Sequence, residues 1–333
     1  MLEFAIITGA KAFLVLNVLL LSCAWLTYLE RRVLAAMQSR IGPNTAGFKG
    51  LLTPIADLVK LLFKEDIIPA AAHKPLYLLA PLLAFIPAML PLAVIPFGNS
   101  ITLFGRDINL VVSEFNLGIL FILAMTSLGI YGIIMAGWSP NSKFSLLGGL
   151  RSSAQMISYE IGLGMSFIGV IMVAGTLNMV ELVNQQDSFM HWYIWKQPVG
   201  FLMYLICAFA ETNRAPFDLP EAESELVAGY HTEYSSMRFG LFFVGEYANM
   251  VTVAAVATTV YLGGWQGPFL ESGPWFLPVL YFVIKCFAFL FFYIWVRGSL
   301  PRFRYDQLMK FGWYVLIPIA LANILITALV VLL

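Results

Sequence analysis

The apolar run FAIITGAKAFLVLNVLLLSCAWLTYL, residues 4–29, decides the fold class of this chain. About 20 apolar residues suffice for a helix to cross the hydrocarbon layer of a membrane. The run is too long for the apolar core of a signal peptide and lacks a small-residue cleavage pattern, so it predicts a first membrane span. Since 60% of the 333 residues are hydrophobic and only 11% are charged, the whole chain has this character. Soluble domains carry about a quarter charged residues. The sequence therefore predicts an all-α integral membrane protein.

Eight such segments predict eight spans within a single membrane domain that covers residues 1–333. Their expected ranges are residues 4–29, 76–97, 117–138, 156–177, 195–211, 239–263, 276–297 and 312–332. Residues 53–65, between the first two spans, have the pattern of an amphipathic helix on the membrane surface. Ile55, Leu58 and Leu62 fall on its apolar face.

The distribution of basic residues predicts the orientation. Connections that follow odd-numbered spans hold fifteen Lys and Arg residues, and the opposite side holds three, Lys11, Arg106 and Lys196. Basic loops stay on the cytoplasmic side, or the matrix side in an organelle. We therefore expect both termini on the outer side and residues 211–238 in a cytoplasmic loop. The fifteen are Arg31, Arg32, Arg40, Lys49, Lys60, Lys64, Lys74, Lys143, Arg151, Arg214, Arg238, Arg297, Arg302, Arg304 and Lys310.

Several classes of bound group have no motif in this chain. The three cysteines are far apart, and no CxxC pair or Cys/His cluster exists, which argues against an iron–sulfur or zinc site. No glycine-rich nucleotide motif occurs. The net charge is zero and no basic stripe is present, so nothing indicates nucleic acid. Any redox centre is expected in another chain.

An acid-rich stretch, ETNRAPFDLPEAESELVAGYHTEYS at residues 211–235, stands out in so apolar a chain. It contains six of the 19 acidic residues and one arginine, Arg214. An Asp-x-x-Glu pattern can cap a helix, so these acids need no function beyond capping and solubility. Carboxylates that are crowded and partly buried raise one another's pKa values, and the alternative is a group that handles protons. The six are Glu211, Asp218, Glu221, Glu223, Glu225 and Glu233.

Ionisable residues inside the expected spans give a second indication. Glu160 and Glu246 lie within spans four and six near the cytoplasmic side, Lys285 lies near the middle of span seven, and Glu30 ends span one. An ionisable group inside a bilayer costs a few kcal/mol or more unless it faces a cavity or a partner. Static internal ion pairs, or interfacial anchoring for Glu30, remain the alternatives to proton transfer. His231 is either a proton relay or a hydrogen-bonding bystander.

Several long motifs resemble one known family, the H subunits of the proton-pumping NADH:quinone oxidoreductase (subunit 1 of mitochondrial respiratory complex I). They include YLERRVLAAMQSRIGPN, GWSPNSKFSLLGGLRSSAQMISYEIG, ETNRAPFDLPEAESELVAGYHTEYSSM, GEY and LPRFRYDQLM. The motifs follow the family's order, and the likeness extends over most of the chain. The resemblance implies eight membrane helices and no redox cofactor in this chain, with flavin and iron–sulfur clusters in partner subunits. It also implies quinone as substrate, and the lipid bilayer, other membrane-arm subunits and hydrophilic quinone-module subunits as partners.

The same resemblance implies roles for individual residues. A proton-coupling set would start near the quinone cavity and continue into the bundle: Glu30, Glu160, Glu211, Asp218, Glu221, Glu223, Glu225, Glu233 and Glu246. The quinone entrance would be formed by Arg31, Arg32, Ile55, Leu58, Leu62 and Phe217.

Two other functions fit part of the pattern. A related membrane subunit of an ion-pumping hydrogenase-type complex would use no quinone. A stand-alone secondary transporter would also bury charges, but such proteins often show an internal hydropathy repeat, and none is found here. The sequence leaves open ubiquinone or menaquinone, proton or sodium, and a bacterial inner membrane or a mitochondrial one.

Overall fold

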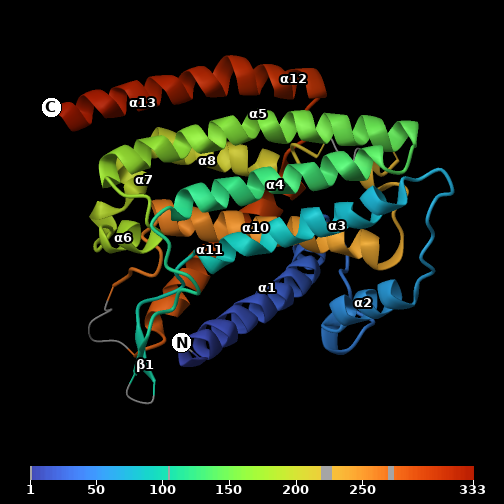
Figure 1. The fold of residues 1–333 in the computed structure, drawn as a ribbon, viewed down its shortest axis with the longest axis horizontal. Coiled ribbons are helices and arrows are strands. Elements are labelled where there is room, and N and C mark those ends of the chain that lie inside the picture. The colour runs from blue at the N-terminus through green and yellow to red at the C-terminus, as the bar shows by residue number, and fades with distance from the viewer. Residues whose placement is uncertain (1, 104–105, 219–226, 269–273) are drawn as a thin grey trace.

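The computed structural model describes residues 2–103, 106–218, 227–268 and 274–333 and consists of a bundle of long helices (Figure 1). Both ends of the chain, at the start of α1 and the end of α13, lie on the same side of this bundle (Figure 1). Among the described residues seven helices are long and apolar enough to cross a membrane. An eighth, α8, is apolar but shorter. The all-α fold class is thus confirmed, while eight crossings and outer termini stay predictions.

The long helices follow the apolar runs of the sequence. They are α1 (Leu2–Met37), α3 (Lys74–Met89), α4 (Gly118–Trp138), α5 (Lys143–Ala174), α8 (Pro198–Glu211), α10 (Ser236–Tyr261) and α11 (Leu277–Ser299), followed by α12 (Tyr305–Phe311) and α13 (Ile317–Leu332), which a π-helical turn at Gly312–Leu316 joins. In an apolar stretch of 18 residues from each long helix, 61% of the positions in α10 are buried, against 17% in α1 and in α12–α13. The bundle is therefore built around α10.

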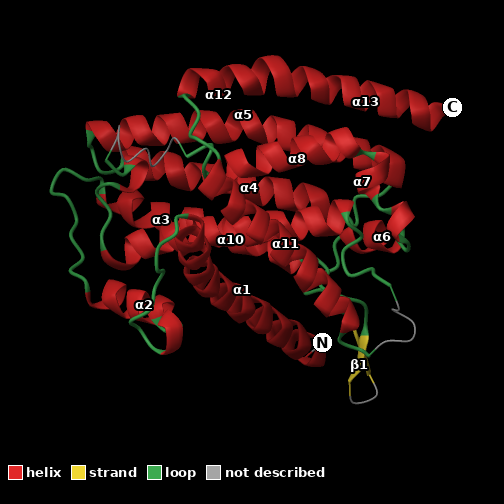
Figure 2. Cartoon of the chain, turned by 180° about the vertical axis from the view of Figure 1, so that it is seen from behind, coloured by secondary structure: helices red, strands yellow, loops and turns green. Residues whose placement is uncertain are grey.

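Short elements connect the long ones. They are α2 (Thr53–Phe63), α6 (Met179–Asn184), α7 (Tyr193–Lys196), the 3-10 turns Phe48–Gly50, Leu90–Ala93, Phe189–His191 and Gly229–His231, and the strands β1 (Ile101–Leu103) and β2 (Arg106–Ile108). The two strands pair antiparallel, with Ile101 opposite Ile108, a hairpin that the sequence analysis did not anticipate. The expected surface helix is present as α2, beside the main bundle (Figure 1, Figure 2).

Helix α5 begins thirteen residues earlier than the span expected at residues 156–177. The added segment is rich in Ser and Gly, which lowered its hydropathy, but these small residues are the ones it buries against its neighbours. A Cβ atom on Gly149 would lie 2.9 Å from the Cα atom of Gly137 in α4, so only glycine allows this close approach. As a result Glu160 lies in the middle of a long helix, and not one turn from its start.

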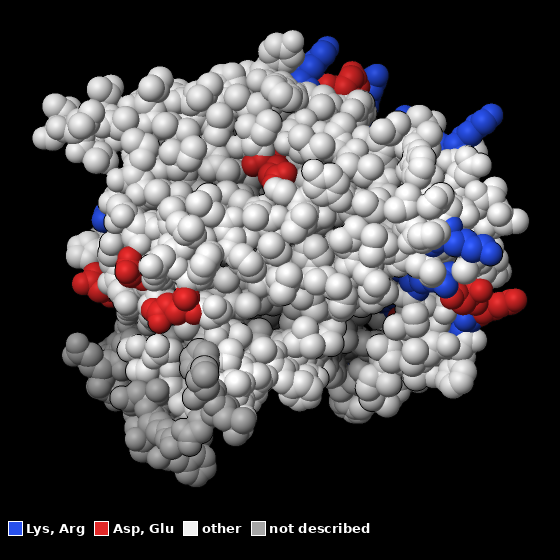
Figure 3. All heavy atoms as spheres, in the orientation of Figure 1, with Lys and Arg blue, Asp and Glu red and all other residues white. Residues whose placement is uncertain are grey.

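On the face of the molecule that Figure 3 shows, charged side chains are nearly absent from the middle of the surface. In the space-filling view Lys, Arg, Asp and Glu gather around α2 and α12 and, on the opposite side, near α6, with one isolated acidic spot between (Figure 3). Apart from that spot, the broad band between the two groups is uncharged, as expected of a surface that faces lipid.

Candidate functional site

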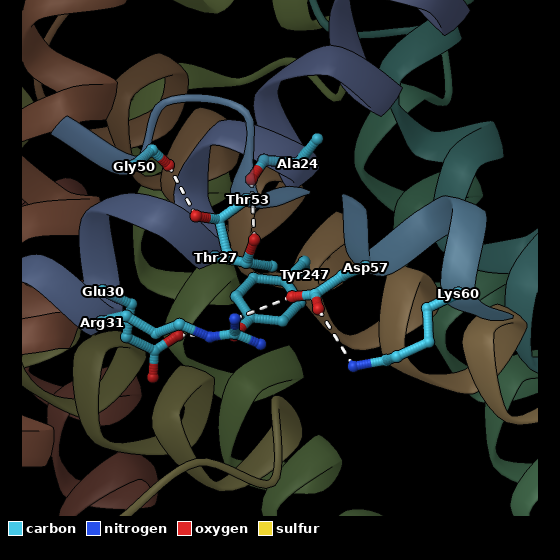
Figure 4. A network of polar contacts seen from close by, with 9 residues as sticks. All are labelled: Ala24, Thr27, Glu30, Arg31, Gly50, Thr53, Asp57, Lys60 and Tyr247. Carbon is cyan, nitrogen blue, oxygen red and sulfur yellow. Dashed lines mark hydrogen bonds and ion pairs between the residues drawn. The ribbon is translucent and has the colours of Figure 1, made fainter. Parts of the chain in front are cut away.

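Glu30 is buried at the junction of three helices. Its side chain in α1 is 4% exposed and is paired with Arg297 of α11. Its second oxygen accepts a hydrogen bond of 2.6 Å from the hydroxyl of Tyr247 in α10 (Figure 4). The interfacial-anchor alternative is therefore wrong for Glu30, although it suits its neighbours Arg31 and Arg32, which are exposed. Because helical neighbours point in different directions, three adjacent charges end in different surroundings.

Arg214 joins Glu30 to a second buried carboxylate. The arginine follows the end of α8, and its guanidinium lies 3.6 Å from a Glu30 oxygen and 3.4 Å from a Glu246 oxygen. It also stacks over the ring of Tyr247, 4.4 Å from the ring centroid. The three charged side chains are between 4% and 11% exposed. In such a site each charge depends on its partners, because water is largely excluded.

Glu246 faces a narrow cavity inside the bundle. One of its oxygens accepts a hydrogen bond of 3.0 Å from the hydroxyl of Tyr230. The cavity, lined also by Glu211, Asn213 and Asn249, admits a water-sized sphere over about 20 Å³. That is room for one or two water molecules, which can carry protons between carboxylates.

Glu211 ends α8 and is buried, and one of its oxygens has no hydrogen-bond partner among the described residues. Glu160 of α5 is half-buried, accepts a hydrogen bond from Ser127 of α4, and lies near enough to Glu211 for the two carboxylates to interact electrostatically. The structure therefore brings Glu30, Glu211 and Glu246 together around Arg214 and the cavity. It gives Glu160 a separate polar partner.

The remaining acids of the stretch divide into three cases. Asp218 is paired with Arg302 at 2.7 Å. Glu233 supplies its backbone carbonyl to Tyr77 at 2.8 Å, and within the described chain its carboxylate is not joined to the Arg214 network. The segment that holds Glu221, Glu223 and Glu225 lies outside the described residues.

His231 is buried, and desolvation lowers its pKa to about 4. It is therefore neutral near pH 7, which favours the bystander interpretation over a proton relay.

The apolar face of α2 is open, as the amphipathic pattern requires. Ile55, Leu58 and Leu62 are 60%, 52% and 54% exposed. Asp57, on the other face, is paired with Arg31 at 2.7 Å and Lys60 at 3.2 Å, so α2 is tied to α1 (Figure 4). Partial burial opposes ionisation of Asp57, but these two cations lower its pKa below the usual value.

Phe217 has a different environment from the other residues of the expected quinone entrance. It is buried, stacks on Phe303 at a centroid distance of 5.5 Å and contacts Tyr159 of α5 at 5.6 Å. Its contacts are therefore with α5 and the segment before α12, whereas α2 packs on α1 and α10.

Among the described residues Lys285 bonds to backbone carbonyls, and none of its partners there is the carboxylate that a static ion pair would need. Its ammonium group donates to the carbonyls of Leu262, Gly264 and Gln266 at 2.7, 3.0 and 2.6 Å. It also lies 4.4 Å from the ring centroid of Trp192. An ammonium group has three hydrogens, so its donors are fully used where the chain leaves α10.

We expect the Lys285→Met variant to lower stability without a selective loss of activity. Hydrogen bonds to a charged group are worth about 1.5–3 kcal/mol, and the three carbonyls would lose their donor. The measurement is the thermal unfolding midpoint of the purified assembly, with activity expressed per assembled complex. A normal midpoint with lost activity would give Lys285 a functional role instead.

Sequence reasoning missed the roles of four residues of this site: Arg214, Arg297, Tyr230 and Tyr247. Arginine and tyrosine near a span end are usual interface residues, so their type gave no signal. Their roles follow from packing between elements far apart in the chain, as with Glu30 and Tyr247, which are 217 positions apart.

Comparison with known proteins gives a consistent family. The model of the family described as NADH dehydrogenase matches residues 10–328. A relative from Geobacter sulfurreducens, named as H subunit 2 of NADH-quinone oxidoreductase, is 54% identical, covering 96% of this chain and 95% of the relative. One from Koribacter versatilis with the same name is 51% identical and covers 98% of both chains. The H subunit of NADH-quinone oxidoreductase from Thermomicrobium roseum is 52% identical over 98% of this chain and 96% of its own.

With a family model spanning nearly the whole chain and several full-length relatives at half identity or more, this protein belongs to the NADH dehydrogenase family.

Proposed function

We propose that this chain is a membrane subunit of a bacterial NADH:quinone oxidoreductase, a proton-translocating complex, and that it is not catalytic alone. In this role it forms the path by which quinone enters and couples quinone reduction to proton translocation. The family and the names of its bacterial relatives support the complex and favour it over the hydrogenase-type alternative. The observation that carries the coupling role is Arg214, held between Glu30 and Glu246 in the interior.

The chemistry of quinone explains why such a network is useful. Reduction to quinol consumes two electrons and two protons, so charge changes where water is scarce and is felt over several ångströms. Arg214 is shared by two carboxylates, and a shift of the guanidinium toward one weakens its hold on the other. A buried carboxylate that loses its cation is stabilised by taking up a proton. Water in the cavity beside Glu211 and Glu246 would deliver that proton.

The open face of α2 supports a role in quinone entry. A quinone has an apolar tail and a polar head, and it needs an apolar wall at the depth of the lipid headgroups. Ile55, Leu58 and Leu62 supply such a wall, and the pair of Arg31 with Asp57 holds α2 against α1. Arg32 donates to the carbonyls of Pro43 and Lys49 and so orders the segment that leads into α2.

Replacing Leu58 with tryptophan tests this path. A bulky side chain would narrow it, and we expect the KM for quinone to rise about fivefold, equivalent to about 1 kcal/mol of binding. The measurement is quinone-dependent NADH oxidation in membranes. Leu321→Trp on the exposed face of α13 is the matched control, because Leu321 is 49% exposed and α13 lies on the opposite side of the bundle from α2 (Figure 1). Equal KM values for the two variants would remove α2 from the path.

The partners follow from the family and from the complex that the relatives' names give. Electrons must come from flavin and iron–sulfur clusters in hydrophilic subunits at the predicted cytoplasmic loops, and other membrane-arm subunits would cover part of the apolar surface. The location is the inner membrane of a bacterial cell.

Purification through a tag on this chain is the decisive experiment. Co-purified flavin and iron–sulfur subunits with inhibitor-sensitive NADH:quinone activity are expected, and co-purified hydrogenase subunits would overturn the proposal.

A further inference from the structure

Gln155 of α5 binds the beginning of the acid-rich stretch at three points. The residue is fully buried, and its amide nitrogen donates to the carbonyl of Ala210 at 2.8 Å and to that of Phe217 at 2.9 Å. It also approaches the side-chain oxygen of Asn213 at 3.3 Å. These acceptors bracket Glu211, which lines the cavity, and Arg214, which lies between the buried carboxylates.

The three acceptors fix the orientation of the amide. Only the NH₂ group of a glutamine can face three oxygens, because its carbonyl would be repelled by all of them. The carbonyl oxygen of Gln155 therefore points elsewhere. It is buried and has no hydrogen-bond partner among the described residues. An unsatisfied buried polar atom costs about 1–3 kcal/mol, so its retention calls for an explanation.

A second buried glutamine shows what a purely structural role looks like. The amide nitrogen of Gln186 also contacts three carbonyls, those of Leu182, Thr259 and Val260, at 3.1 to 3.4 Å. Its oxygen, however, accepts two backbone hydrogen bonds, from Tyr193 at 3.1 Å and Gly263 at 3.0 Å. Both glutamines are 0% exposed, so burial alone does not account for the unused acceptor of Gln155.

We propose that Gln155 is a positioning residue of the coupling site: its nitrogen holds residues 210–217 on α5, and its oxygen accepts a hydrogen bond from a proton-carrying group, a water molecule or a protonated carboxyl. Asn213, whose side-chain oxygen lies 3.3 Å from the Gln155 nitrogen, lines the cavity together with Glu211. An O–H donor that reaches this region gives the Gln155 oxygen a hydrogen bond. The arrival of a proton therefore changes the hydrogen bonding of the residue that positions the backbone around Glu211 and Arg214. This inference rests on the proposed function.

The Gln155→Glu variant tests both halves of the amide. A charged carboxylate has no hydrogen to donate and faces three acceptors, whereas the protonated form donates one hydrogen bond. We expect NADH:quinone activity of the assembled complex to fall about tenfold at pH 8 and to recover in part as the pH is lowered. The Gln155→Leu side chain can neither donate nor accept a hydrogen bond, so this variant should lose activity and proton translocation at every pH. Electron transfer from NADH to a soluble acceptor should be unchanged in both.

The matched control is Gln186→Glu, which alters an equally buried glutamine with three carbonyl partners. We expect it to lower assembly but to leave the pH profile of quinone activity per assembled complex as in the wild type. A wild-type pH profile in Gln155→Glu, or normal pumping in Gln155→Leu, would overturn the positioning role. Failure of both Gln155 variants to assemble would assign a structural role only and would also overturn it. The proposed function is judged separately, by inhibitor-sensitive quinone activity of the wild-type assembly.

Discussion

An Arg214→Met variant is expected to lose NADH:quinone activity and most of the assembled complex. Methionine keeps much of the side-chain volume but leaves Glu246 without its cation, while Glu30 retains Arg297. Removing one partner of a buried ion pair costs about 3–5 kcal/mol, which corresponds to about a hundredfold or more in the assembled fraction. The measurements are the amount of complex in membranes and quinone-dependent NADH oxidation.

Adding Glu246→Gln to Arg214→Met should restore assembly, because it removes the uncompensated charge. Activity should stay low, since the carboxylate is then missing. Arg304→Met is the control, as the pair of Arg304 with Asp306 is exposed, and exposed pairs contribute about 0–1 kcal/mol. Normal assembly and activity in Arg214→Met would show that the network is dispensable.

The Glu246→Gln variant alone is expected to assemble yet to lose turnover and pumping together. The amide has nearly the shape of the carboxylate, and its oxygen can still accept the hydrogen bond from Tyr230. The folded state therefore changes little, but the group can no longer bind and release a proton. Because quinone reduction is coupled to proton translocation, quinone reduction stops as well. The measurements are quinone reductase activity and proton uptake by membrane vesicles, with a soluble electron acceptor to verify the hydrophilic subunits.

Glu181→Gln, at an exposed position in the first turn of α6, provides the comparison for Glu246→Gln. It is expected to leave turnover and pumping unchanged. If Glu246 only balances a fixed charge, its variant would lower thermal stability while each assembled complex works normally. A normal ratio of protons to electrons in Glu246→Gln would thus exclude it from the proton path.

An acidic residue inside an apolar run predicts that the residue has a partner, but it does not predict which partner. Glu160 and Glu246 were both recognised because an acid inside an apolar run is costly without a partner. The partner itself could not be read from the run. The structure gives Glu246 an arginine and a tyrosine, Arg214 and Tyr230, and gives Glu160 the hydroxyl of Ser127. Lys285 met the same criterion and turned out to bind three backbone carbonyls.

The sequence by itself determined the membrane class, the helical fold, the position of nearly every long helix, the surface helix and the family. These features depend on local properties, because the length of an apolar run and a contiguous motif can each be read from one continuous segment. The tertiary structure alone decided that Glu30 is buried while Arg31 and Arg32 are exposed, that Arg214 lies between two carboxylates, and that Gln155 holds the stretch that carries it. Those roles depend on contacts between helices, such as Glu30 with Arg297, 267 residues apart. No local pattern specifies which side chains meet across such a distance, since the packing of the whole bundle sets it.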